Sequence, residues 1–207
     1  MTTKEKILHV ALELFNNKGY NEVGVREIAR ALHMSPGNLS YHFSKKEDIF
    51  FELMKKYSQN NDRLFEGFLG NEVTLKGFLS LMRNMLKAQY KHRGLLLAHG
   101  FIRSEIKNED RLNYSGTSGR RTQGLAEILY QLQIANQINA SKEDTEFLMG
   151  FLRLFGRFSI QEAFFQHKTR KESEVVRYYI KMLSKQMSLF ATKKGLASIG
   201  EFEENMG

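Results

Sequence analysis

Hydrogen-bonding side chains are concentrated in one short segment of the chain, MSPGNLSYHF, residues 34–43. The segment holds the only proline of the sequence, and helical patterns precede and follow it. Amide, hydroxyl and imidazole groups of this kind can contact base edges and phosphate oxygens of nucleic acid. No acid or nucleophile stands in a readable relation to the histidine, so acid–base catalysis is not indicated. The residues expected to face outward are Pro36, Gly37, Asn38, Ser40, Tyr41 and His42.

The same segment contains the signals of a short helix. Ser35 is a suitable N-cap, and Pro36 then takes the first helical position, where a missing N–H is harmless. Leu39 and Phe43 are four residues apart and therefore share one face, which we expect to be buried. Gly37 leaves room for a close approach of another molecule. The pattern predicts a recognition helix, while a simple turn between two core helices is the alternative interpretation.

Flanking helices must position this segment. Residues 3–18 carry apolar side chains at helical spacing, begin with a capping box of Thr2 and Glu5, and end at Gly19. Residues 25–32 predict a second, short helix on which Arg26 could reach a phosphate or a base, or could simply be solvated. Ser44 and Glu47 have capping-box spacing and predict the start of a fourth helix at Lys45 and Lys46. The order of these elements is that of a helix-turn-helix unit.

At the level of motifs, residues 4–51 resemble the N-terminal signature of the TetR family of bacterial transcriptional regulators. The resemblance rests on ILHVALELFNNKGY, VREIARAL, MSPGNLSYHF and SKKEDIFFEL, in this order. It implies that residues 25–32 and 35–41 are the two helices of the DNA-reading motif and that Lys46 contacts phosphate. It also implies a homodimer, a small-molecule effector and a palindromic double-stranded DNA operator as partners.

Two positions depart from the family pattern. His33 stands where the family usually has a glycine, so that the turn must accept a side chain. Ser40 stands where a tyrosine is common, and the tyrosine follows at Tyr41. The phosphate contact of that tyrosine therefore falls either to the shorter hydroxyl of Ser40 or to Tyr41.

The positive net charge of the chain agrees with a polyanionic partner such as DNA, but it does not show which residues bind that partner. The chain has 207 residues, of which 42% are hydrophobic, and a formal net charge of +8. Residues 1–60 hold nine lysines and arginines against seven acidic residues, so most of the surplus lies beyond them. DNA affinity must then come from the placement of Arg26, Arg30, Lys45 and Lys46 rather than from a general basic field.

The rest of the chain also reads as helical, which makes the fold class all-α. Alternating strand patterns are absent from the sequence, and the expected helices cover 74–91, 93–106, 109–136, 142–167 and 172–192, with a frayed acidic tail. Ser141 and Asp144 suit an N-cap. A polar run at 58–62 and the glycines at 67 and 70 suggest a division there. We therefore predict an N-terminal helix-turn-helix DNA-binding domain, residues 1–57, and a larger helical effector-binding and dimerisation domain, residues 58–200.

Wide apolar arcs mark the last two expected helices. Phe158 on 142–167 and Tyr179 on 172–192 belong to arcs that either fill one core or pair with a second copy across a twofold axis. An effector cavity would need apolar walls with a few polar groups. Its candidates, which suit a plain core equally well, are Phe78, Met82, Met85, Leu86, Tyr90, Phe101 and Phe155, with His99 or Arg103 as the polar element.

The sequence thus predicts a sequence-specific DNA-binding transcriptional regulator, a repressor released from its operator by a small-molecule effector. The alternative is an architectural DNA-binding protein without an effector. No nucleophile–base pair, phosphate-binding glycine loop or metal-ligand spacing is evident, so we expect no enzyme activity, cofactor or metal. The absence of cysteine, of a signal peptide pattern and of an apolar run near the ~20 residues that span a bilayer favours the cytoplasm and no membrane partner.

Overall fold

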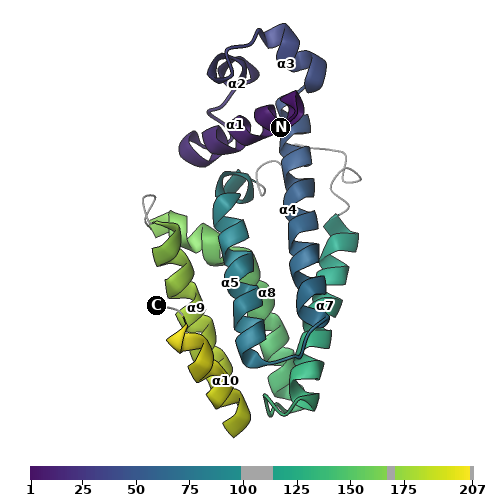
Figure 1. Ribbon diagram of the computed structural model, residues 1–207, viewed down its shortest axis with the longest axis vertical. Coiled ribbons are helices and arrows are strands. Elements are labelled where there is room, and N and C mark those ends of the chain that lie inside the picture. The colour runs from purple at the N-terminus through teal and green to yellow at the C-terminus, as the bar shows by residue number, and fades with distance from the viewer. Residues whose placement is uncertain (99–113, 167–170, 206–207) are drawn as a thin grey trace. The chain divides into compact units, whose positions relative to one another are not determined.

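The computed structural model describes residues 1–98, 114–166 and 171–205, and these are almost entirely helical (Figure 1). The all-α prediction is confirmed. The helices are α1 (Thr3–Lys18), α2 (Val25–Ala31), α3 (Pro36–His42), α4 (Lys46–Leu69), α5 (Leu75–Lys91), α7 (Tyr114–Ile134), α8 (Lys142–Gln166), α9 (Glu172–Ser188) and α10 (Lys193–Glu204). Residues 93–98 are helical as well, while the remainder of the expected helix 93–106 and the start of 109–136 lie outside the described residues.

Packing divides the chain into two compact units. The first unit, here called the head, contains Met1–Asn60 and the described residues from Lys91 onward to position 98. The second unit contains Asn61–Tyr90 and the described residues that follow position 114. The change from one unit to the other falls inside α4, which runs without a break through the polar run at 58–62 and past Gly67. The boundary lies within the polar run at 58–62, where the sequence suggested a division, and α4 continues through it because polar side chains on a helix surface do not end the helix.

The core of the head consists of apolar side chains from α1 to α4 and one residue from the segment after α5. Phe15, Tyr20 and Phe50 form its aromatic centre, with ring centroids 5.1 and 5.3 Å apart. Leu39 and Phe43 of the third helix are buried in this core, as their spacing predicted. The contributor most distant in sequence is Leu95, which is fully buried.

Helix ends agree with the predicted caps in most cases. Thr2 and Glu5 form the expected capping box, Gly19 ends α1 with φ of 90°, and Ser141 and Asp144 cap α8. The exception is the start of α4. There the Asp48 carboxylate, rather than Glu47, accepts hydrogen bonds from the Ser44 hydroxyl and the Lys45 N–H, because the helix begins one residue later than expected.

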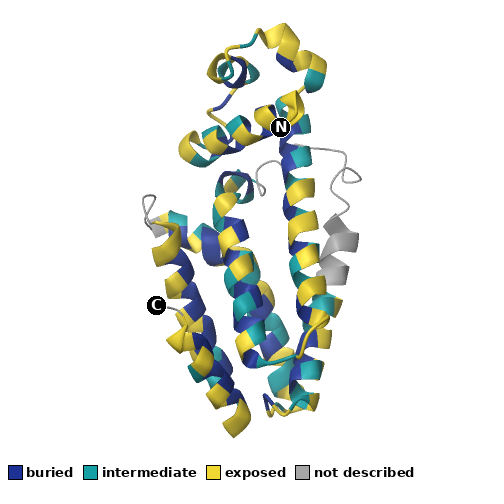
Figure 2. Cartoon of the chain, viewed as in Figure 1, coloured by how far each residue is buried: buried dark blue, intermediate teal, exposed yellow. Residues whose placement is uncertain are grey.

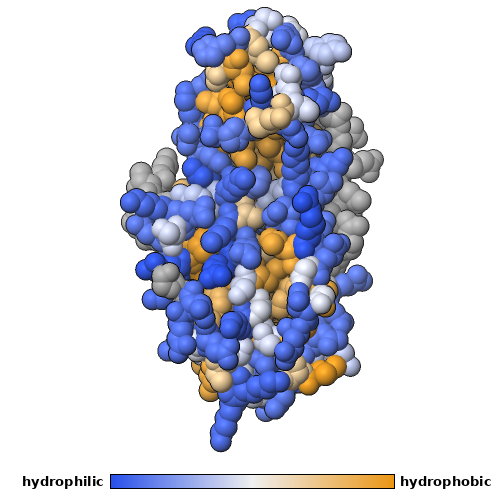
Figure 3. All heavy atoms as spheres, viewed as in Figure 1, coloured by the Kyte–Doolittle hydropathy of each residue, from blue (hydrophilic) through white to orange (hydrophobic). Residues whose placement is uncertain are grey.

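The second unit is built on α5, α7, α8, α9, α10 and the last turns of α4, whose apolar side chains share one core cluster. Burial follows one face of each helix (Figure 2). Hydrophilic residues dominate the face seen in Figure 3, in line with a mean hydropathy of −0.43.

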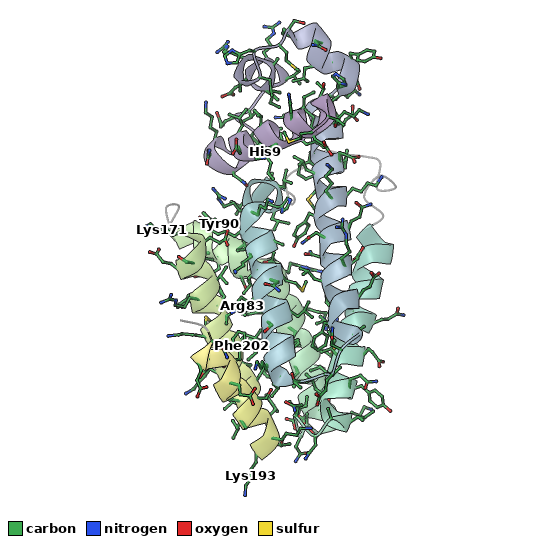
Figure 4. All side chains as sticks on the ribbon, viewed as in Figure 1. His9, Arg83, Tyr90, Lys171, Lys193 and Phe202 are labelled. Atoms are coloured by element: carbon green, nitrogen blue, oxygen red, sulfur yellow. The ribbon has the colours of Figure 1, made fainter. Side chains whose placement is uncertain are left out.

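The C-terminus differs from the expectation of one helix at 172–192 followed by a frayed tail. Helix α9 ends at Ser188, and a separate α10 begins after Thr192, whose hydroxyl accepts the Gly195 N–H. Phe202 of α10 is buried, and the Arg83 guanidinium of α5 lies over its ring (Figure 4). The guanidinium carbon is 5.3 Å from the centroid of the Phe202 ring. The acidic tail is thus a packed amphipathic helix, because its apolar residues have a surface to cover.

Candidate nucleic-acid interface

The turn between α2 and α3 is closed by a paired hydrogen-bond motif at the end of α2. The His33 N–H donates to the Arg30 carbonyl (3.1 Å), and the Met34 N–H donates to the Ala29 carbonyl (3.0 Å). This arrangement is a Schellman motif, which requires a left-handed residue at its centre. His33 takes that place with φ of 53°, so the turn does accept a side chain where a glycine would be easier.

Helix α3 is fixed at one end by a cap and along one side by two apolar residues. The Ser35 Oγ accepts the Asn38 N–H (3.1 Å), and Pro36 occupies the first turn. Leu39 is fully buried and Phe43 nearly so. Because both anchors lie on one face, the orientation of the opposite face is determined by the core of the head.

That opposite face contains the residues that the sequence singled out. Ser35, Pro36, Gly37, Asn38, Ser40 and Tyr41 are all exposed, with 85% of Tyr41 accessible to solvent. His42 is half-buried and lies edge-on to the Tyr41 ring. The structure thus brings six of the predicted residues onto one accessible surface, with His42 at its border.

Gly37 has open space around it. A Cβ placed there would meet nothing closer than the Ser35 Oγ at 4.0 Å. The protein's own packing therefore does not require a glycine at this position, and any requirement for one must come from outside the chain.

Cationic side chains flank α3 on both neighbouring helices. Arg26 and Arg30 are exposed and four residues apart, so that they share one face of α2. Glu27, between them, forms an ion pair with Lys18 of α1. Lys45 is exposed just before α4.

Lys46 has a different environment from the other lysines. Its ammonium group donates to the Tyr20 carbonyl (2.9 Å) and lies 4.1 Å from the centroid of the Tyr20 ring. Burial lowers the pKa of this amine, against the opposing influence of the Glu47 and Glu22 carboxylates. The side chain thus joins the start of α4 to the loop after α1. Sequence reasoning missed this contact, because nothing local links residues 26 positions apart.

A second feature missed by sequence reasoning ties the segment after α5 to α1. The Asn16 side chain accepts the Gly94 N–H and donates to the Lys91 carbonyl, both at 2.8 Å. A Cβ at Gly94 would lie 2.3 Å from the Phe15 carbonyl oxygen, so only glycine permits this approach. The sequence offered one signal for this contact, a glycine shortly after the basic end of a helix. That signal is not specific, because glycines are common at helix ends whether or not another backbone lies close.

The second unit presents a separate apolar surface, here called the α8–α9 face. It consists of Phe147, Leu154, Phe158 and Phe165 of α8, Tyr178 and Met182 of α9, and Leu189 directly after α9, all exposed in the single chain. Phe155 and Tyr179, in contrast, are buried, and the Tyr179 hydroxyl donates to Glu162. The wide apolar arcs are therefore divided between two environments: Tyr179 belongs to the core, and Phe158 is exposed on the surface of the single chain.

Of the cavity candidates, Phe78, Met82, Leu86 and Phe155 are buried members of the core of the second unit, and Met85 and Tyr90 pack against it. Positions 99, 101 and 103 lie outside the described residues. An open groove of about 710 Å³ lies between α9 and α10, and Arg177, Lys181 and Lys185 line it. Its hydrogen-bonding groups are partly satisfied, since the Ser184 hydroxyl donates to Glu203 (2.6 Å).

Within the described residues, no group of three metal-ligating side chains comes together. None of the helices in that part of the chain is both long and apolar enough to cross a membrane.

Comparison with known proteins gives similarities over the head and over the whole fold. The family model described as "Bacterial regulatory proteins, tetR family" matches residues 7–53. The probable HTH-type transcriptional regulator YttP of Bacillus subtilis is 31% identical over 98 residues, which are 46% of this chain and 47% of the relative. The HTH-type transcriptional regulator QacR of Staphylococcus aureus is 48% identical over 54 residues, 26% of this chain and 29% of the relative.

The matches to these curated relatives thus span about half of one and under a third of the other. A crystal structure of a TetR-family transcriptional regulator from Marinobacter aquaeolei VT8 resembles the whole fold. Its TM-score is 0.86 at 22% identity, and the match covers 100% of this chain and 99% of the other. The relatives are transcriptional regulators, in agreement with the prediction that the chain is not an enzyme.

Proposed function

We propose that the chain, whose residues 7–53 match the TetR family model, is a TetR-family regulator that binds a specific DNA operator as a homodimer and represses transcription until a small-molecule effector releases it. The observation that carries the proposal is the exposed face of α3, held in place by Leu39 and Phe43, with Asn38 in its first turn and two arginines on the preceding helix.

Each residue of this face has a role that its chemistry supports. The Asn38 amide can bond both N6 and N7 of an adenine in the major groove. Pro36 and Gly37 place no long side chain on the first turn of α3, so the helix backbone can approach the bases closely. Ser35, Ser40, Tyr41 and His42 offer hydrogen bonds to phosphate oxygens, and Arg26 and Lys45 offer charge. Lys46 keeps two further N–H groups for phosphate beside its bond to Tyr20.

The α8–α9 face supports the homodimer. Seven exposed apolar side chains on two packed helices would be costly in water, and a second copy can cover them around a twofold axis. A twofold dimer presents two α3 helices, so we expect a palindromic operator. Repression follows from occupancy, since a dimer on both half-sites excludes other proteins from the same DNA.

The test is to select the operator from a random DNA pool and then measure the binding of matched variants to it and to its single-base variants. Asn38→Ala should weaken binding by about 5- to 150-fold, equivalent to roughly 1–3 kcal/mol, and relax the preference at one base pair per half-site. Gly37→Trp should weaken binding to all sequences alike, because the indole holds α3 away from the groove. Both variants should fold, since both positions are exposed.

Leu39→Ala is the matched control beside them in the sequence. It removes a fully buried side chain and should lower stability by about 2–5 kcal/mol. If Asn38→Ala and Gly37→Trp bind like the parent, α3 is not the recognition helix. If the pool yields no preferred sequence although the protein binds DNA tightly, the architectural function replaces the regulatory one.

A further inference from the structure

Asn61 is a polar residue in an apolar row. The buried face of α4 carries Leu53, Tyr57 and Phe68, and Asn61 takes the place in this row where an apolar side chain is expected. Only 1% of the residue is exposed. Neither its amide nitrogen nor its amide oxygen has a hydrogen-bond partner among the described residues.

An unpartnered amide of this kind needs an explanation. Buried polar atoms in folded proteins are nearly always hydrogen-bonded, since each one left without a partner destabilises the folded state. Two other interior polar groups of the same unit are hydrogen-bonded: the Gln89 side-chain amide donates to the Gly156 carbonyl (2.7 Å), and the Ser159 hydroxyl donates to the Phe155 carbonyl. The Arg83 Nε, in contrast, is also buried without a partner among the described residues. Gln161 of α8 resembles Asn61 in one of its two polar atoms. Its side-chain oxygen is buried and has no hydrogen-bond partner in the part of the chain that the structure describes.

The buried face of α4 on which Asn61 lies is otherwise apolar. The turns of α4 that follow it carry Leu64, Phe65 and Phe68 into the core of the second unit. The Phe65 ring lies 3.6 Å from the point where a Cβ of Gly124 on α7 would stand. In such surroundings an unpaired carboxylate or ammonium group is strongly disfavoured, while a neutral group that bonds the amide is not.

We propose that Asn61 is the polar anchor of the effector site and that the site takes an uncharged, mainly apolar molecule carrying a hydrogen-bond donor and acceptor side by side. A primary amide has this arrangement, since its N–H can donate to the Asn61 oxygen while its carbonyl accepts from the Asn61 nitrogen. The inference rests on the proposed effector-controlled function and adds to it the chemical class of the effector.

One arm of the test needs no ligand. Leucine has nearly the shape of asparagine without its polar atoms, so Asn61→Leu should raise the melting temperature of the ligand-free protein. Leu64→Asn on the same helix is the reciprocal control and should lower it. A lower melting temperature for Asn61→Leu would overturn the proposal, because the amide would then be satisfied within the protein.

The second arm compares three probes with one eight-carbon chain and different head groups: octanamide, octanoate and octylamine at neutral pH. Octanamide should bind about tenfold or more tightly than the two ions, as measured by calorimetry, and Asn61→Leu should abolish that preference. Equal binding of the ions, no binding of octanamide, or a preference that survives Asn61→Leu would each overturn the proposal.

The two arms also separate this inference from the function on which it rests. Release from the selected operator is measured with the same three probes. If octanamide binds through Asn61 but leaves the operator complex intact, the ligand class holds and the proposed control of DNA binding fails. If the operator complex responds to octanoate or octylamine instead, the control holds and the ligand class fails.

Discussion

At the scale of single residues, His33 holds a backbone conformation that suits glycine. Its φ of 53° costs a non-glycine residue up to about 1–2 kcal/mol. We expect His33→Gly to relieve this strain and to raise the free energy of unfolding by up to about 1 kcal/mol. The gain is smaller than the strain because glycine has more conformational freedom in the unfolded chain. Thermal melts would measure this.

Asn136, with the same φ of 53°, is the control for His33. Asparagine tolerates the left-handed region better than histidine, so Asn136→Gly should give a smaller gain. A loss of stability on His33→Gly would mean that the imidazole makes a contribution larger than the strain.

Lys46 predicts a pH dependence of stability at the alkaline end. Burial lowers the pKa of its amine below the reference value of 10.5 in the folded protein, so the unfolded chain holds this proton to higher pH. Stability rises with pH wherever the unfolded state binds more protons. The contribution of Lys46 to the free energy of unfolding should therefore increase as the pH approaches 10.5.

Urea unfolding of the parent and of Lys46→Met over this range would isolate the contribution, because all other groups are shared. The difference between the two proteins should grow in favour of the parent as the pH rises. A difference that shrinks would mean that the Tyr20 carbonyl and ring outweigh burial and hold the proton more tightly in the folded state.

At the scale of elements, the close approach of Gly94 to α1 is a contact that a single added methyl group would disrupt. Gly94→Ala places a Cβ 2.3 Å from the Phe15 carbonyl oxygen, so the segment after α5 must move away from α1 and withdraw Leu95 from the core of the head. We expect a loss of more than about 2 kcal/mol in the free energy of unfolding, measured by denaturant titration.

Gly67→Ala is the matched control for Gly94. A Cβ at Gly67 meets no atom within 4 Å, and the residue lies within α4. This substitution should stabilise the protein by roughly 0.5–1 kcal/mol through helix propensity. Equal effects of the two substitutions would contradict the docking of residues 91–98 on α1.

The exposed α8–α9 face leads to a prediction in which loss of the dimer can be distinguished from loss of the fold. Phe158 is 50% exposed in the single chain, so Phe158→Glu should give a folded monomer, because the charge is solvated in the monomer and buried in the dimer. Analytical ultracentrifugation beside circular dichroism would measure this.

Ile134→Glu on α7 is the control for Phe158, since Ile134 is 61% exposed and lies outside the α8–α9 face. It should leave the dimer intact. Tyr179→Glu, in contrast, should unfold the second unit, because Tyr179 is buried. A Phe158→Glu protein that remains dimeric would place the interface elsewhere.

At the scale of the whole molecule, the position of charge matters more than its sum. The chain has a net charge of +8, but residues 1–60 carry a surplus of only two. If Lys45 contacts one phosphate per protomer, as proposed, Lys45→Ala should reduce the slope of log affinity against log salt by about 1 for each such contact. The triple change Arg177→Gln, Lys181→Gln, Lys185→Gln removes more charge and should leave the slope unchanged. A lower slope for the triple variant would indicate that the α9 cations also contact DNA.

The sequence alone determined the features that depend on neighbours along the chain. The N-cap of α3, the capping box of α1, the Gly19 stop and the inward Leu39–Phe43 pair are local, since each involves residues within about one helical turn. The all-α class and the exposed face of α3 followed from these signals. The resemblance to a family then supplied the expectation of DNA binding, an effector and a dimer.

Only the tertiary structure decided the features that join distant residues. Tyr20 bonds Lys46, Asn16 bonds Gly94, and α10 covers the Arg83 side of α5, across separations that no helical period encodes. It also divided the apolar arc of α8 between the core and the exposed face. Asn61 is the sharpest case: in the sequence it belongs to a polar run at 58–62, and only packing shows it buried with its amide unpartnered among the described residues. Burial depends on what folds back over a helix, and the helix's own sequence does not contain that information.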